Sequence, residues 1–362
     1  MRHPLHSMCP YFAMFPEEYV ARQLLAFTRP GDLVLDPFCG RGTTILESTL
    51  HSRRAIGTDV NLVAACVSGA KAEVPALDEV LARIDHLETH FVAGGLSVPD
   101  GEFFEYCFHS ETLGELLFLR AELRWREDPI DRFVAAVALG ALHGEAHRSP
   151  NYFSNRMPRT ISTKPEYSVR WWKERNLAPD RRRVFPILRA LSRARLSILA
   201  PSGLAKVALE DARNCAEVFS EHEGEVRLMV TSPPYLDTTD YSEDQWLRIW
   251  FLGGPERPKR KMSLDDRHTN KENYWDFLSE VWAGTERLLG SEATIAIRIG
   301  GKKLDVDEIS NGLSMSLKKG LSRGFHLLDA PNTSEIKNGQ LNSFRPGALG
   351  KRHEHDFVFR LH

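Results

Sequence analysis

The stretch TSPPY, residues 231–235, follows an apolar run and combines residue types that can hold an amine. Proline lacks a backbone N–H and fixes its own φ, so two consecutive prolines end a strand in a rigid corner. At that corner the Ser232 hydroxyl and the Pro233 carbonyl stand side by side, because Pro234 cannot continue a β ladder. These two acceptors would hold an amine by its protons, and Tyr235 adds a flat face for stacking. We predict these four residues as catalytic, against the alternative of a purely structural corner.

A second candidate site is LDPFCGRGTT, residues 35–44, where a buried strand pattern ends and a helix pattern begins. Backbone N–H groups can approach a ligand closely at such a junction. The stretch lacks the GK[ST] ending of a loop that binds nucleoside triphosphates. Asp36, at the strand end, suits a cationic amine rather than a pyrophosphate.

Two further acids follow strand patterns. Asp59, in AIGTDV, lies roughly 20 residues beyond the first glycine, where folds of this kind hold a ribose through its hydroxyls. Asp211, in ALEDAR, is placed to accept from an adenine amine. A strand-end aspartate also caps the following helix, so each acid alone stays open to that interpretation. The three acids together predict a pocket for a nucleoside that carries an amino acid, which is S-adenosylmethionine.

The order of strand and helix patterns predicts a doubly wound α/β domain with one large interruption. The expected strands are residues 32–37, 54–60, 206–211, 227–232 and 293–300, with helices beginning at residue 43 and covering residues 62–72. GFHLLDA and HDFVFRL predict an antiparallel strand pair near the C-terminus. Residues 75–202 are mostly helical by spacing. We therefore expect a catalytic domain of residues 1–74 and 203–362, interrupted by a helical insertion that is a candidate target-recognition region.

Together, MFPEEYVARQLL, VLDPFCGRGTT, IGTDV, EDAR and TSPPY resemble the DNA methyltransferases that modify exocyclic amines, in particular the cytosine-N4 enzymes with SPPY. The resemblance covers residues 9–71 and 206–300. It implies a Rossmann-like methyltransferase fold with S-adenosylmethionine as cofactor. The residues that would bind this cofactor are Phe15, Pro16, Asp36, Pro37, Phe38, Gly40, Gly42, Thr43, Asp59 and Asp211. This chain departs from the family in the long segment between Asp59 and Asp211, because family members usually have these two motifs closer together in sequence.

The resemblance implies transfer of a methyl group to the N4 amine of cytosine in duplex DNA, with the target base flipped out of the helix. Conjugation with the ring makes this amine a poor nucleophile, so holding it by its protons at the TSPPY corner would expose its lone pair. A cytosine-C5 reaction is disfavoured because it needs a cysteine nucleophile, and the chain has no Pro-Cys pair. Three alternatives stay open: an adenine-N6 DNA methyltransferase, an RNA amine methyltransferase and a non-catalytic DNA-binding regulator.

Residues 148–195 form a basic block, with 13 Lys and Arg against three acids in a chain whose net charge is −2. Such a block favours a polyanionic partner, and a solvated helical face is the competing interpretation. We expect arginines here to contact phosphates of double-stranded DNA, and NSFRPG near the C-terminus to reach the target strand. The predicted DNA-binding residues are Arg148, Arg156, Arg159, Arg181, Arg182, Arg183 and Arg345. A cognate restriction endonuclease is a candidate functional partner.

The remaining features limit the class of protein. The N-terminal residues lack an apolar signal region, and no apolar run reaches the roughly 20 residues of a membrane span, which favours a cytoplasmic protein. Five scattered cysteines without a CxxC pair argue against a disulfide framework or a zinc site. His143 and His147 lie four residues apart, and we interpret them as surface histidines or phosphate contacts rather than metal ligands. Four apolar residues are predicted as a buried helix face: Trp246, Ile249, Trp250 and Leu252.

Overall fold

The structure is a computed structural model that describes residues 2–10, 16–94, 97–144, 149, 151–157, 164–236, 245–257, 270–301, 304–335 and 353–362. The chain divides into two compact units. The first, which we call the helical unit, consists of Met1–Phe12, Val74–Ala200 and Asp240–Met262. The second, the sheet unit, consists of Ala13–Glu73, Pro201–Thr239 and Ser263–His362. The helical unit therefore takes in two segments that the sequence assigns to the catalytic domain.

An eight-stranded sheet forms the centre of the sheet unit. Its order is β3-β2-β1-β4-β5-β8-β6, and β7 also pairs with β8. The strands are β1 (Leu33–Asp36), β2 (Arg54–Thr58), β3 (Ala205–Ala208), β4 (Val226–Thr231), β5 (Leu289–Gly301), β6 (Phe325–Leu327), β7 (Asn332–Glu335) and β8 (His353–Leu361). β1 to β5 run parallel, whereas β8 runs antiparallel to its neighbours. The predicted doubly wound, mostly parallel sheet is confirmed, with β6 and β8 as the predicted antiparallel pair.

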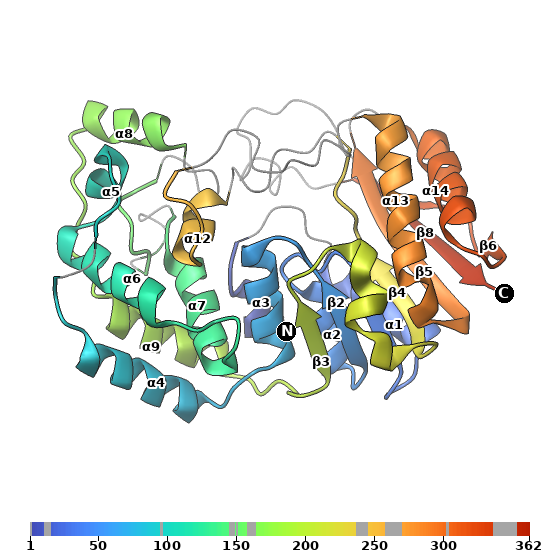
Figure 1. Cartoon of the computed structure of the whole chain (residues 1–362), viewed down its shortest axis with the longest axis horizontal. Coiled ribbons are helices and arrows are strands. Elements are labelled where there is room, and N and C mark those ends of the chain that lie inside the picture. Colours follow the sequence, from blue (N-terminus) through green and yellow to red (C-terminus); the bar gives the residue numbers. More distant parts are fainter. Residues whose placement is uncertain are drawn as a thin grey trace. The chain divides into compact units, whose positions relative to one another are not determined.

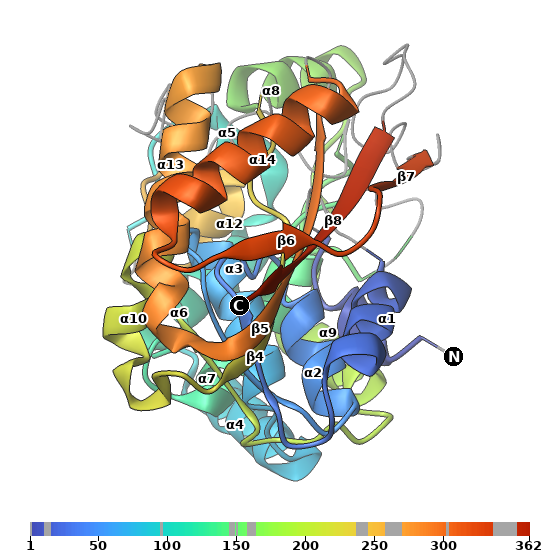
Figure 2. The same ribbon diagram turned by 90° about the vertical axis from the view of Figure 1, so that its right-hand side faces the viewer.

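Helices cover both faces of this sheet (Figures 1 and 2). They are α1 (Glu17–Phe27), α2 (Thr43–Leu50), α3 (Leu62–Ala72), α10 (Cys215–Val218), α13 (Lys271–Thr285) and α14 (Val306–Gly320), with the 3₁₀ turns η2 (Ala212–Asn214), η3 (Ser220–His222) and η5 (Glu286–Leu288). Val34 and Leu228 pack with α1 on one face, while Leu35 and Met229 face the core beneath α13 and α14. Successive side chains of a strand point to opposite faces, so a strand covered on both sides is apolar throughout.

The helical unit consists of α4 (Leu77–His90), α5 (Glu102–Cys107), α6 (Ser110–Glu122), α7 (Pro129–Ala141), α8 (Pro165–Glu174), α9 (Val184–Arg195), α12 (Trp246–Phe251) and the 3₁₀ turn η1 (Pro4–Ser7). Its core is aromatic: the rings of Phe103 and Phe104 contact Trp246, and Phe104 also contacts Trp250. The four residues predicted as a buried face around α12 are all buried. Within the described ranges, no helix is long and apolar enough to cross a membrane.

Candidate cofactor and catalytic site

Asp36 is the last residue of β1 and is buried where the strand meets the glycine loop. Its Oδ1 accepts hydrogen bonds from the backbone N–H of Phe38 at 3.1 Å and from the Thr231 hydroxyl at 3.0 Å. Its Oδ2 is buried and has no hydrogen-bond partner in the described part of the chain. Burial raises the pKa of Asp36 to about 6, and the Thr44 hydroxyl, the Phe38 N–H and the Thr231 hydroxyl oppose this shift. Buried acceptors are nearly always paired in folded proteins, so Oδ2 is available for a donor on a ligand.

Asp59 follows β2 and holds the glycine loop from the neighbouring strand. Its carboxylate accepts hydrogen bonds from the backbone N–H groups of Gly40 and Asn61, each at 2.9 Å. Burial raises the pKa of Asp59 to about 6. Because β1 and β2 pair in parallel, with Asp36 opposite Gly57, both carboxylates lie at the same edge of the sheet.

The loop between β1 and α2 requires glycine for two reasons. Gly40 and Gly42 have φ values of +51° and +74°, a region that other residues adopt at a cost. A Cβ at Gly42 would also come within 2.8 Å of Ser68 on α3. Gly42 is the N-cap of α2, so Thr43 begins this helix as predicted. The loop therefore brings the N-terminus of α2 to the edge where Asp36 and Asp59 lie.

Asp211 is engaged within the protein. It caps η2 by accepting a hydrogen bond from the backbone N–H of Arg213 at 3.0 Å. The guanidinium of Arg213 also forms a bidentate pair with Asp211 at 2.9 and 2.6 Å and reaches Glu280 at 3.0 Å. The capping role that the sequence leaves open for a strand-end aspartate is thus present here. A contact with adenine stays a prediction for Asp211, and it would share the carboxylate with Arg213.

The TSPPY corner begins at the end of β4, next to β1. Thr231, the last residue of β4, makes the hydrogen bond to Asp36 described above, so the corner and the glycine loop lie at one edge of the sheet. Ser232 donates a long hydrogen bond to the Tyr235 hydroxyl at 3.4 Å, and this hydroxyl donates to Glu354 Oε1 at 2.9 Å. A Cβ at Gly300 would lie 3.2 Å from the Tyr235 ring. Tyr235 is therefore held through both its hydroxyl and its ring.

The sequence did not identify Glu354 or the arginine beside it as part of this site. Arg298 on β5 forms a buried bidentate pair with Asp356 on β8 at 2.6 and 2.8 Å, and lies 3.6 Å from Glu354. Its guanidinium lies 4.1 Å from the centre of the Tyr19 ring. Burial raises the pKa of Glu354, and the charge of Arg298 opposes the shift. These contacts depend on the antiparallel register of β5 with β8, in which Arg298 faces Asp356.

Of the other predicted cofactor residues, Pro37 and Phe38 belong to the loop that follows β1, Pro16 precedes α1, and one lies outside the described residues. Phe38 packs against the core with its ring centre 6.0 Å from that of Phe277. The Pro37 carbonyl accepts a hydrogen bond from the Thr58 hydroxyl at 2.9 Å, which ties the end of β1 to β2. Pro16 is the N-cap of α1. Phe15 lies outside the described residues.

The predicted DNA-binding arginines differ in their surroundings. Arg148, Arg159 and Arg345 lie outside the described residues. Arg156 and Arg183 are exposed. Arg182 pairs with Asp180 at 3.2 Å, and Arg181 is only partly exposed because it pairs with Glu111 at 3.0 Å and with the buried Glu115 at 2.6 Å. Arg181 therefore joins α6 to the segment before α9, a role that the sequence did not reveal.

We expect Arg181→Met to lower the free energy of unfolding by about 1–3 kcal/mol, because Glu115 would lose its charged partner at a buried position. Arg183→Met is the matched control, since the exposed Arg183 neighbours the same helix and should change stability by less than about 0.5 kcal/mol. Urea unfolding of both variants measures the difference. Equal stability of the two variants would show that the Arg181–Glu115 pair is not a structural contact.

The histidines of the HGEAH stretch are not both at the surface. His143 is fully buried, and neither ring nitrogen has a hydrogen-bond partner among the described residues. Burial lowers its pKa well below the usual range, with a smaller contribution from Arg248. The expectation of a surface histidine is thus wrong for His143, because the chain that leaves α7 is buried through Ala141, Leu142 and His143. His147 lies outside the described residues, and within the described ranges no group of three or more His, Cys, Asp or Glu side chains could hold a metal ion.

Comparison with known proteins bears on the segment that contains the glycine loop. Residues 3–65 match the DNA methylase family, whose profile is named for N6 and N4 methyltransferases. The resemblance to the DNA amino-methyltransferases is therefore confirmed over this segment.

Two curated relatives match this chain over short stretches. The chain is 41% identical over 49 residues to the orphan methyltransferase M.BamHII of Bacillus amyloliquefaciens and 43% identical over 51 residues to the type II methyltransferase M.Cfr9I of Citrobacter freundii. Each match covers 14% of this chain, and the matches cover 18% and 17% of the two relatives. The chain thus spans less than a fifth of the length of these relatives. Among solved structures, TrmN from Thermus thermophilus overlays 99% of this chain and 52% of its own at 13% identity, with a TM-score of 0.36.

Proposed function

We propose that this protein is an S-adenosylmethionine-dependent methyltransferase that acts on the exocyclic N4 amine of cytosine in duplex DNA. One observation carries the proposal: the Thr231 hydroxyl donates to Asp36 at 3.0 Å. This contact joins the residue before SPPY to the aspartate of DPFCG, although 195 positions separate them in sequence. An acceptor corner for an amine and a carboxylate for a cationic amino group therefore share one edge of the sheet, where open α/β folds bind ligands.

The residues at this edge fit S-adenosylmethionine. Asp36 offers a buried oxygen without a partner in the described residues, which suits the cationic amino group of the methionine part. Asp59 has unused lone pairs beside its two backbone contacts and suits the ribose hydroxyls. The N-terminus of α2 suits the methionine carboxylate. When bound, the cofactor supplies an electrophilic methyl group on a sulfonium.

The contacts of Ser232 leave its oxygen free to accept. Its single proton is used in the hydrogen bond to Tyr235, and Tyr235 in turn donates its proton to Glu354. The lone pairs of the Ser232 oxygen are then available to a proton of the target amine, together with the carbonyl of Pro233. Held by two acceptors, the amine nitrogen directs its lone pair toward the methyl group. Most of the rate would come from this alignment, for which effective molarities reach about 10⁵ to 10⁸ M.

Duplex DNA as substrate requires the target base to leave the stack before it reaches the corner. The DNA methylase description of the matching family model supports DNA rather than RNA, and the relatives are named as type II and orphan methyltransferases. Cytosine is favoured over adenine by the SPPY form of the corner. Adenine-N6 methylation is the second candidate, because the profile that matches is named for both N6 and N4 enzymes. The helical unit, with exposed cations such as Arg156 and Arg183, is the proposed target-recognition region.

The class of substrate is tested by incubating the protein and labelled S-adenosylmethionine with plasmid DNA or with bulk transfer RNA. We expect acid-precipitable label in the DNA and none above background in the RNA. Label confined to RNA would replace the proposal with an RNA amine methyltransferase. No label in either, together with measurable cofactor binding, would favour a non-catalytic regulator.

A further inference from the structure

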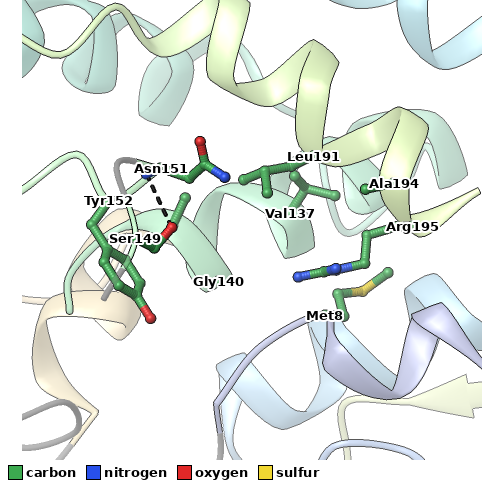
Figure 3. Close-up of a pocket in the computed structure, with 10 residues that line it drawn as sticks. Met8, Val137, Gly140, Ser149, Asn151, Tyr152, Leu191, Ala194 and Arg195 are labelled. Atoms are coloured by element: carbon green, nitrogen blue, oxygen red, sulfur yellow. Dashed lines mark hydrogen bonds between the residues drawn. The ribbon is translucent and has the colours of Figure 1, made fainter. Parts of the chain in front are cut away.

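A cavity of about 280 Å³ lies within the helical unit, whereas the glycine loop and the TSPPY corner belong to the sheet unit. It is lined by the segment that follows η1, by α7 and by α9, together with Ser149, Asn151 and Tyr152 (Figure 3). One part of its wall is apolar, with Met8 and Val137 buried there. The other part carries the polar side chains of Arg195, Asn151 and Tyr152.

Arg195 is the unusual residue of this cavity. It occupies the end of α9, and Figure 3 shows its guanidinium extending from this helix past Met8 toward α7. It is partly buried, yet it forms no ion pair or hydrogen bond with any residue that the structure describes. Burial lowers its pKa, although an arginine remains protonated at neutral pH. A partly buried cation without a partner is unfavourable for the protein alone.

Other arginines with buried or partly buried side chains in this unit have acceptors: Arg120 donates to the carbonyls of Trp250 and Gly254, and Arg248 donates to the Leu139 carbonyl and to Gln245. Two further arginines have carboxylate partners. Arg189, on the same helix, pairs with Asp85 and Glu88, and Arg181 pairs with Glu111 and Glu115. No carboxylate belongs to the described lining of the cavity. Arg195 therefore differs from these arginines in having neither a carboxylate nor a hydrogen-bond acceptor among the described residues.

The neighbouring polar groups are also free to bind. The amide of Asn151 and the hydroxyl of Tyr152 have no hydrogen-bond partner within the described part of the chain. Ser149 accepts a hydrogen bond from the backbone N–H of Asn151 at 3.2 Å, which leaves its own proton available. One guanidinium, one amide and two hydroxyls thus offer donors around a cavity that carries a positive charge. This is the donor set that binds a phosphate, for which a guanidinium supplies two parallel hydrogen bonds.

We propose that this cavity is a phosphate-binding site, in which Arg195 pairs with the anion and the apolar wall contacts the sugar or base attached to it. The phosphate comes either from a free mononucleotide or from the backbone of DNA bound by the helical unit. The second source rests on the function proposed above, and the first does not. Both sources share the phosphate chemistry, so the same substitutions test them.

The experiment compares three variants of the full chain. Arg195→Met removes the charge and keeps most of the side-chain length. Arg193→Met, two residues earlier on α9, is the matched control because Arg193 is exposed and does not line the cavity. Arg195→Lys keeps the charge and should restore part of the binding. Because Arg195 has no partner to lose, Arg195→Met should have a thermal midpoint equal to or above that of the parent. A midpoint in this range would show that a loss of binding does not come from a loss of folding.

Calorimetric titration with inorganic phosphate, with AMP and with a 20-base-pair duplex measures the effect. We expect Arg195→Met to weaken binding of at least one phosphate-bearing probe by tenfold or more, and Arg193→Met to weaken AMP binding by less than twofold. An effect on AMP identifies a free nucleotide as the source, whether or not the protein methylates DNA. An effect on the duplex alone identifies the DNA backbone. If Arg195→Met binds phosphate, AMP and duplex as the parent does, the cavity is not a phosphate site.

Discussion

Ser232→Ala is expected to lower kcat by about 10² to 10³, the loss seen when one hydrogen-bonding group that acts in the transition state is deleted. The substitution removes an acceptor for the target amine and keeps both prolines of the corner. It also keeps the hydrogen bond between Tyr235 and Glu354. Affinities for S-adenosylmethionine and for duplex DNA should therefore stay within about twofold of the parent. Single-turnover methylation with the cofactor and DNA in excess measures the effect.

Tyr235→Phe is the companion to this substitution. It removes the hydroxyl that accepts from Ser232 and donates to Glu354, but it keeps an aromatic face for the target base. A smaller loss of kcat than in Ser232→Ala is expected, because the serine loses its orientation and not its oxygen. A Ser232→Ala variant that methylates DNA at the parental rate would show that the corner is only structural.

Asp36→Asn is expected to weaken S-adenosylmethionine binding by about 10- to 100-fold at pH 8, since a hydrogen bond to a charged group contributes about 1.5–3 kcal/mol. The amide keeps an oxygen for Phe38 and Thr231, so the apo fold should persist. Asp32→Asn is the matched control, because Asp32 precedes the other end of β1 and accepts only a surface contact from Arg29. Calorimetric titration measures all three proteins, and equal affinities would remove Asp36 from the cofactor site.

The same carboxylate predicts a pH dependence. Burial raises the pKa of Asp36 to about 6, so the apo protein takes up a proton there as the pH falls through 6. A cationic amino group binds the ionised form, and parental affinity should therefore fall below pH 6. Burial also raises the pKa of Asp59 to about 6, so protonation of Asp59 adds to the pH dependence of cofactor affinity. Below pH 6, the affinity of Asp36→Asn for the cofactor should fall less steeply than that of the parent, by up to about tenfold less per pH unit.

The apo protein should show the opposite trend. A carboxyl whose pKa is raised on folding favours the folded state most at low pH, and this contribution is lost as the pH rises toward 6. Asp36→Asn should therefore gain stability relative to the parent between about pH 4 and pH 7. Thermal unfolding of both proteins across this pH range measures whether the stability of Asp36→Asn rises or falls relative to that of the parent.

The strands and the loop between β1 and α2 could be predicted because local residue patterns determine them. The run LVLD is apolar on both faces, glycines follow it, and α2 begins at Thr43, as the pattern indicates. Parallel pairing then brings the ends of β1, β2 and β4 to one edge, so the proximity of Asp36, Asp59 and the TSPPY corner follows from strand order.

Contacts that depend on register or on helix packing could not be predicted. Glu354 reaches Tyr235 only because β8 pairs antiparallel with β5 in the register that sets Glu354 opposite Gly300. A shift of one residue would turn Glu354 to the other face. Likewise, Arg181 reads as one of three equivalent arginines in the sequence, and only the packing of α6 gives it the buried partner Glu115.

The most direct test of the proposed function is the identity of the methylated nucleoside. Duplex DNA is incubated with the protein and with S-adenosylmethionine that carries a deuterated methyl group, then digested to nucleosides and analysed by mass spectrometry, with Ser232→Ala run in parallel. The account predicts deuterated N4-methyldeoxycytidine with the parent and little or none with the variant. Deuterated N6-methyldeoxyadenosine would keep the site and change its substrate, whereas the absence of any deuterated nucleoside from DNA would contradict the account.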